Sequence, residues 1–125
     1  MFNEIEEILK KDSRYKIQAY AFVLEALEVA RRLVGKNKHV SGKELLEGIR
    51  VLAQKQYGIM AKTVFESWGI KTTDDFGEIV FNLVEAKLLS KTEEDSKEDF
   101  HNVFDFEEVF IKKYTFPKRN ELKKI

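Results

Sequence analysis

The chain has 125 residues, 43% of them hydrophobic and ten of them Phe, which is enough for one domain with a sizeable core. It has no Cys, so thiolate catalysis, disulfides and zinc-finger sites are excluded. The apolar stretch AYAFVLEALEVA is interrupted by Glu25 and Glu28 and is too short to span a bilayer. The acidic start MFNEIEEILKK is unlike a signal peptide. The sequence is therefore typical of a cytoplasmic protein with no membrane association.

The zero net charge hides a strong charge pattern along the chain. Residues 1–73 carry a formal charge of +4, residues 74–108 carry −9, and residues 109–125 carry +5. One acidic segment therefore lies between two basic ones, which favours contacts between charged surfaces.

Two helices are expected in the N-terminal third. Residues 3–11 place Ile5 and Ile8 on one side, and the segment Asp12–Arg14 offers capping groups for the next helix. That helix, over residues 14–34, has two apolar stripes at helical spacing. So wide an apolar arc indicates a central helix that packs on two sides.

The middle of the chain predicts two further helices. SGKE is a capping box in which Ser41 and Glu44 each satisfy the backbone N–H of the other, and the helix that it begins runs to about Tyr57. Gly48 inside this helix costs about 1 kcal/mol relative to Ala, so we expect another helix to approach it closely. IMAKTVFESW then forms a shorter helix that ends at Gly69.

The stretch DDFGEIVFNLVEAKLLSKTEEDSKEDF predicts an amphipathic helix followed by a β-hairpin, with Thr73 as the N-cap of the helix. LLSKT and FHNVFDF flank the charged turn EEDSKED, and Phe104 and Phe106 alternate as they would on one face of a strand. A short final helix is expected over residues 106–114.

Helix, helix, turn, helix and hairpin is the order of a winged helix. We therefore predict a mainly α domain with a small β-hairpin (α+β), in which a winged-helix-like core over residues 41–108 follows two N-terminal helices within residues 3–34. The C-terminal helix 106–114 completes a single domain, residues 1–116, before the basic tail 117–125. An unrelated small α+β or helical domain is the alternative.

Nearly the whole chain, about residues 12–113, takes part in one family resemblance. The segments concerned are KDSRYKIQAYAFVLEALE, KHVSGKELLEGIRVLA, WGIKTTDDFGEIVFNLVEAKLLSKTEEDSKEDF and FDFEEVF. Together they resemble a small bacterial family catalogued as a Verruco-Plancto-restricted conserved protein. The resemblance implies no catalytic residue, because no activity is assigned to that family.

The solvent-facing arc of the helix after Thr73 is acidic, whereas DNA-reading surfaces owe their affinity to Lys and Arg. Of this arc, Asn82 alone is a good base reader. The arc is either a solvated acidic face, a docking face for a basic protein surface or a second copy of the chain, or, least favoured, a DNA reader. The candidate acidic interaction face consists of Asp75, Glu78, Asn82 and Glu85.

A second candidate surface is basic and surrounds the loop before the helix that Ser41 begins. Free N–H groups at a helix N-terminus attract anions, so this loop could hold a phosphate, a nucleic-acid backbone or an acidic protein segment. A solvated loop with an ordinary cap is the simpler interpretation. The patch consists of Arg31, Arg32, Lys36, Lys38, His39, Ser41 and Lys43.

Catalytic chemistry finds little support in the sequence. His39 and His101 fall on different elements without metal-ligand spacing, and no third partner completes a nucleophile–base set with Ser41. We therefore expect no enzyme activity, no cofactor and no resident metal. A loose divalent-cation site at the acidic turn 93–99 stays open, although the turn lacks the spacing of a calcium loop.

The sequence thus predicts a non-enzymatic protein-interaction module that uses segregated acidic and basic surfaces. Its partner would be an unidentified protein or a second copy of the chain. The alternative is a DNA-binding regulator that contacts the backbone through the basic loop 31–43 and the tail.

Overall fold

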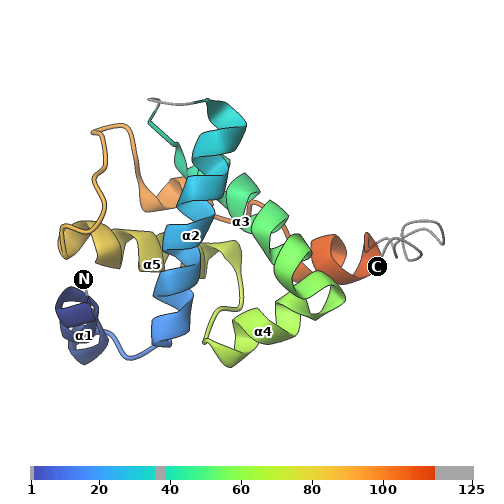
Figure 1. The fold of residues 1–125 in the computed structure, drawn as a ribbon, viewed down its shortest axis with the longest axis horizontal. Coiled ribbons are helices and arrows are strands. Elements are labelled where there is room, and N and C mark those ends of the chain that lie inside the picture. Colours follow the sequence, from blue (N-terminus) through green and yellow to red (C-terminus); the bar gives the residue numbers. More distant parts are fainter. Residues whose placement is uncertain (1, 36–38, 115–125) are drawn as a thin grey trace.

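The computed structural model describes residues 2–35 and 39–114. Every regular element in these two ranges is helical. In Figure 1, α2 runs through the middle of the molecule, with α1 and α5 on one side and α3 and α4 on the other. The α-helices are α1 (Phe2–Lys11), α2 (Ile17–Val34), α3 (Gly42–Tyr57), α4 (Ala61–Ser67) and α5 (Thr73–Glu85). Three shorter helical turns are η1 (Gly58–Met60), η2 (Lys97–Phe100) and η3 (Glu107–Lys112).

α2 is the central helix that its two apolar stripes predict. It buries Tyr20 and Phe22 among other side chains and contacts α1, α3 and α5. α2 and α3 approach closely at Gly48, where an added Cβ would lie 2.8 Å from both the backbone oxygen of Ala26 and the Cβ of Ala30. The expected close approach at Gly48 is therefore confirmed.

Capping side chains set the starts of α3 and α5. The Ser41 hydroxyl accepts the backbone N–H of Glu44 at 3.1 Å, and the Glu44 carboxylate accepts the N–H of Ser41 at 2.9 Å, so the predicted capping box is confirmed. At α5 the predicted cap is wrong by one residue. Thr72 is the N-cap, and Thr73 is the first residue of the helix and is buried.

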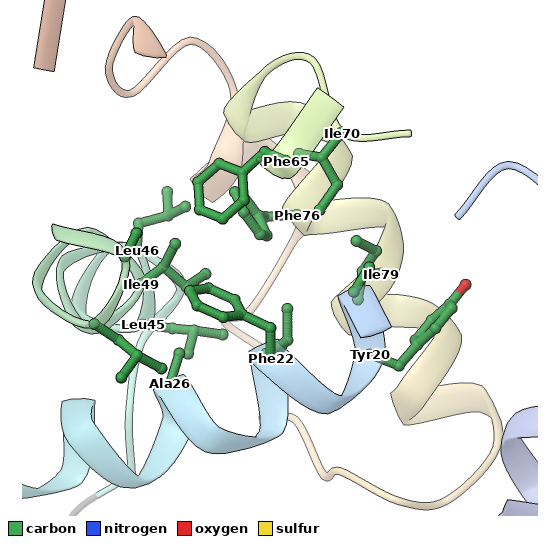
Figure 2. Packing of buried hydrophobic residues seen from close by; sticks show 14 of the residues in the cluster. Tyr20, Phe22, Ala26, Leu45, Leu46, Ile49, Phe65, Ile70, Phe76 and Ile79 are labelled. Carbon is green, nitrogen blue, oxygen red and sulfur yellow. The ribbon is translucent and has the colours of Figure 1, made fainter. Parts of the chain in front are cut away.

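Phe65 of α4 lies at the centre of an aromatic core. Its ring centroid is 5.1 Å from that of Phe76, 5.4 Å from Phe22, 5.4 Å from Phe106 and 5.6 Å from Phe110. These pairs meet edge to face, which is a favourable arrangement for aromatic quadrupoles. Figure 2 shows the rings of Phe22, Phe65 and Phe76 converging with aliphatic side chains of α3 and α5.

The predicted β-hairpin is wrong, because no strand occurs between residues 39 and 114. After α5 the chain forms turns, and the second flank of the expected hairpin begins at Phe100, the last residue of the helical turn η2. The backbone there bonds to a side chain of α5 and not to a neighbouring strand. The Thr73 hydroxyl donates to the carbonyl of Phe100 at 2.7 Å and accepts the N–H of Val103 at 3.1 Å.

The alternating Phe residues that suggested a strand belong to the aromatic core. Phe104 and Phe106 lie 6.0 Å apart, ring centroid to ring centroid, and both rings pack against Phe110. Their spacing of two positions in the sequence arises because an irregular segment places both rings in this core.

Without a hairpin the α+β winged-helix prediction is wrong, and the structure is mainly α. α5 is not presented as a recognition helix, because α1 and η2 both pack against it. Phe100 of η2 lies so close to α5 that a Cβ added at Gly77 would be 3.0 Å from the Phe100 Cβ. The helical turn expected within residues 106–114 is η3, and the predicted basic tail 117–125 lies outside the described residues. Within the described ranges, none of the helices has the length and apolarity needed to cross a lipid bilayer.

Gly48→Ala is expected to destabilise the protein, although Ala favours a helix by about 1 kcal/mol over Gly. The new methyl group would collide with α2, and overpacking of this kind costs about 1–3 kcal/mol. Urea unfolding followed by circular dichroism measures the difference. Lys55→Ala, an exposed change on the same helix, is the control and should stay within about 0.5 kcal/mol of wild type. A Gly48→Ala protein as stable as wild type would contradict the close approach of α2 and α3.

Candidate functional site

The acidic arc of α5 is covered by the linker that joins α1 to α2. The Arg14 guanidinium donates to the carboxylate of Asp12 at 2.7 Å and to that of Glu78 on α5 at 3.0 Å. Asn82, one turn further along α5, donates from Nδ2 to Asp12 at 3.0 Å and to the Tyr20 hydroxyl at 3.1 Å. These bonds fix the linker and α2 to the polar side of α5.

The two ends of the arc differ in exposure. At the start of α5, the carboxylate of Asp75 accepts the hydroxyl of buried Tyr15 at 2.5 Å and the N–H of Lys71 at 2.8 Å. At the far end, Glu85 is exposed and lies 3.8 Å from the ammonium of Lys11. Three of the four residues predicted to form an acidic interaction face therefore hold the fold together.

These contacts shift the pKa values of the groups that take part. The hydrogen bonds from Arg14 hold the pKa of Asp12 well below its usual range, although partial burial opposes them. Burial alone would raise the pKa of Glu78, but hydrogen bonds from Arg14 and Lys97 outweigh it and the pKa is lowered. Burial, followed by the hydrogen bond to α5, raises the pKa of the Tyr15 hydroxyl. At neutral pH, Asp12 and Glu78 therefore stay negatively charged and Tyr15 stays protonated, as their hydrogen bonds require.

The predicted basic patch is also partly used by internal contacts. Arg31 is paired with Glu28 on the same helix, and His39 Nε2 lies 2.7 Å from a carboxylate oxygen of Asp95. Ser41 caps α3. A helix end with its cap in place offers fewer unpaired N–H groups to an anion than an uncapped one.

The remaining members of the patch divide into two groups. Arg32 and Lys43 are exposed, and neither has a side-chain hydrogen bond or ion pair with the described residues. Lys36 and Lys38 lie outside the described residues. The members that the fold brings together are Arg31, His39 and Ser41, which line one hollow.

That hollow, of about 110 Å³, opens between α2, α3, α5 and the segment that follows α5. The C-terminal end of α2, the start of α3 and the long turn after α5, which contribute to its lining, lie at one end of the molecule in Figure 1. Much of its lining is apolar and stays only partly buried. These half-buried side chains are Leu27, Val40, Val80, Phe81, Val84 and Leu89.

Polar groups surround the mouth of the hollow, and one pair of them joins its two sides. His39, before α3, meets Asp95, in the turn after α5. Asp95 also accepts the N–H of Thr92 at 2.8 Å. Burial alone would raise the pKa of Asp95, but the hydrogen bonds from Thr92 and His39 outweigh it and the pKa is lowered. The other polar lining residues are Arg31, Ser41, Ser90, Lys91 and Asp99.

A larger hollow, of about 210 Å³, lies between α1 and α5. Its lining is mostly charged or polar and includes Glu7, Lys11, Asn82 and Glu85. Asn82 and Glu85 already take part in the contacts that hold the linker and α1. The hollow beside α3 is lined by more apolar side chains.

The arrangement of titratable side chains gives no support to catalysis within the described ranges. His101 Nδ1 lies 3.1 Å from the Asp74 carboxylate at the surface, and His39 pairs with Asp95. No three His, Asp or Glu side chains of the described residues come together as metal ligands. At the acidic turn 93–99, the carboxylates of Asp95 and Asp99 accept backbone N–H groups of the turn itself.

Comparisons with known proteins give no family for the chain. No protein-family model matches it, and neither a curated protein nor a solved structure is significantly similar to it. The resemblance to the Verruco-Plancto-restricted family, the absence of enzyme activity and the interaction function therefore stay predictions.

The hollow is the feature that sequence reasoning missed. The sequence of α5 contained a signal for the hollow, because Val80, Phe81 and Val84 make the apolar arc of this helix wider than its fully buried face. The pairing of His39 with Asp95 had no such signal, because the two residues are 56 positions apart.

The Asp12 contacts predict a specific dependence of stability on pH. Because the pKa of Asp12 is lower in the folded protein than its unfolded value of about 3.9, its contribution is complete above that value and is lost as the pH falls below it. Asp12→Asn should therefore cost about 1–2 kcal/mol at neutral pH and flatten the loss of stability in acid.

Melting temperatures measured from neutral to acidic pH test this expectation. Glu94→Gln removes an exposed carboxylate that has no hydrogen bond or ion pair with the described residues, so it should leave the curve unchanged. Parallel acid limbs for wild type and Asp12→Asn would show that the Arg14–Asp12 contact carries no pH-dependent stability.

Proposed function

We propose that the protein is a non-enzymatic interaction module that binds a segment of another protein through the hollow between α2, α3 and α5. The observation that carries the proposal is that most of the apolar side chains lining this hollow are only partly buried. Many of the other large apolar side chains lie in one aromatic and aliphatic core, and the large apolar side chains that are exposed in the described ranges lie outside the hollow. Apolar side chains gathered around a concave site are typical of binding sites.

The size of the hollow favours a single apolar side chain as the anchoring group. An apolar cavity of about 150 Å³ can hold benzene. A hollow of about 110 Å³ with an open mouth therefore suits one Leu, Ile or Phe side chain. Protein interfaces commonly depend on one or a few anchors of this kind, inserted in a pocket and surrounded by polar groups.

The polar rim indicates which groups should flank the anchor. Arg31 and Lys91 are the permanently charged cations of the lining, and the Lys91 ammonium donates to the carbonyl of Thr92 at 3.3 Å. Asp95 and Asp99 already accept backbone N–H groups. A partner segment with a carboxylate beside its apolar anchor would complement Lys91, and it would bind Arg31 by competing with the ion pair to Glu28, in agreement with the acidic protein segment proposed for the basic loop.

We therefore assign the interaction function to the hollow and not to the acidic arc of α5. Asp75, Glu78 and Asn82 are bound to the linker, to Tyr15 and to Tyr20, so a partner at that arc would have to displace the linker or compete for its hydrogen bonds. The DNA-binding alternative stays a hypothesis. Two members of its basic loop, Arg31 and His39, are already paired with carboxylates.

Selection from a displayed peptide library tests the proposal. Wild type is expected to enrich peptides that share one large apolar residue next to Asp or Glu. Val84→Phe, which fills the hollow, should weaken the binding of these peptides by tenfold or more, about 1.4 kcal/mol. Isothermal titration with the selected peptides gives the affinities.

Val103→Phe is the matched control, because it adds the same ring at an exposed position outside the hollow. Its affinity for the peptides should equal that of wild type, and circular dichroism should show that both variants fold. Enrichment of no common sequence, or equal peptide binding by Val84→Phe, would contradict a binding role for the hollow.

A further inference from the structure

The end of α3 opposite the hollow carries an exposed apolar patch. Six large hydrophobic side chains are exposed in the described part of the chain, and three of them lie on η1 and η3. They are Ile59, 39% exposed, Met60, 53% exposed, and Ile111, 38% exposed. η1 and η3 contact each other, so the three side chains come from adjoining elements. Figure 1 shows this end of α3 at its corner with α4, beside the last described turn of the chain.

The charges of η3 flank this patch in a self-complementary order. Glu107 and Glu108 lie at the start of η3, and Lys112 and Lys113 lie at its end. All four are exposed, and none forms an ion pair with another described residue. The segment thus reads as two acids, an apolar centre with Ile111, and two bases.

We propose that this patch is a self-association surface on which two copies of the chain pack η3 against η3 in opposite directions. In a two-fold interface the same residues face each other from both subunits, so each contact occurs twice. Antiparallel packing places Glu107 and Glu108 of each subunit beside Lys112 and Lys113 of the other. The same packing removes Met60 and Ile111 from water at the centre, where apolar burial drives association.

The proposed dimer is independent of the partner-binding function. α3 separates the two surfaces: Gly42, at its start, lines the hollow, and Gly58, directly after its end, belongs to η1. A helix of 16 residues is about 24 Å long. A dimer formed through η1 and η3 would therefore leave both hollows open and present two binding sites.

Sedimentation equilibrium of the full chain over a concentration series tests the proposal. Wild type is expected to be a dimer. Met60→Asp should be a monomer, and Val103→Asp, a matched change at another exposed apolar residue, should stay a dimer.

Charge reversal tests the antiparallel arrangement. Glu107→Lys with Glu108→Lys gives one variant, and Lys112→Glu with Lys113→Glu gives the other. Each variant alone places like charges together, so its dimer should weaken by about tenfold or more. An equal mixture of the two restores opposite charges, and the dimer should return with an affinity near that of wild type. Circular dichroism checks that each variant folds.

Two results would overturn the proposal. A monomeric wild type over the whole series would show that the patch does not bind a second copy. A dimer that persists in Met60→Asp and in both charge variants alone would place the self-association surface elsewhere. Neither result bears on the hollow, because peptide binding by Val84→Phe is measured separately.

Discussion

Arg14 bonds to Asp12 and Glu78 at once, and through these bonds the linker between α1 and α2 is held on the polar side of α5. The apolar side of the same helix faces the aromatic core, where Phe76 packs on Phe65. α5 is thus covered on two sides by its own chain. The strip of Val80, Phe81 and Val84 beside the hollow is left only partly buried, and we propose that this strip contacts a partner.

Charge segregation along the chain does not become charge segregation in space. The acidic segment 74–108 is distributed over α5, the turn after it, and η3, which lies against η1 and α4 at the opposite end of α3. Its carboxylates meet side chains from distant parts of the sequence, as Glu78 meets Arg14 and Asp95 meets His39. Local pairing of opposite charges around an apolar centre is therefore a better guide to a binding surface than the net charge of a face.

Much of the helical framework could be predicted because its signals are local. The capping box at Ser41 and the wide apolar arc of α2 each depend on residues within a few turns of one another, and Gly48 signals close packing by its mere presence in a helix. The hairpin was mispredicted because Phe104 and Phe106 imitate strand alternation, while the real determinant, the bond from Thr73 to Phe100, spans 27 positions. The contacts that the acidic face makes within the chain could not be predicted for the same reason, since Arg14 and Glu78 are 64 positions apart.

The central claim is that the hollow is the binding surface, whereas the polar arc of α5 is structural. Titration of the isotope-labelled protein with benzene, followed by two-dimensional NMR, tests it most directly, because benzene is an uncharged apolar molecule with the ring of a Phe side chain. The account expects saturable shifts confined to the hollow, at Leu27, Val80, Val84 and Leu89, with Asp75, Glu78 and Asn82 unchanged. Shifts centred on the polar arc, or no saturable shift at the hollow, would contradict it.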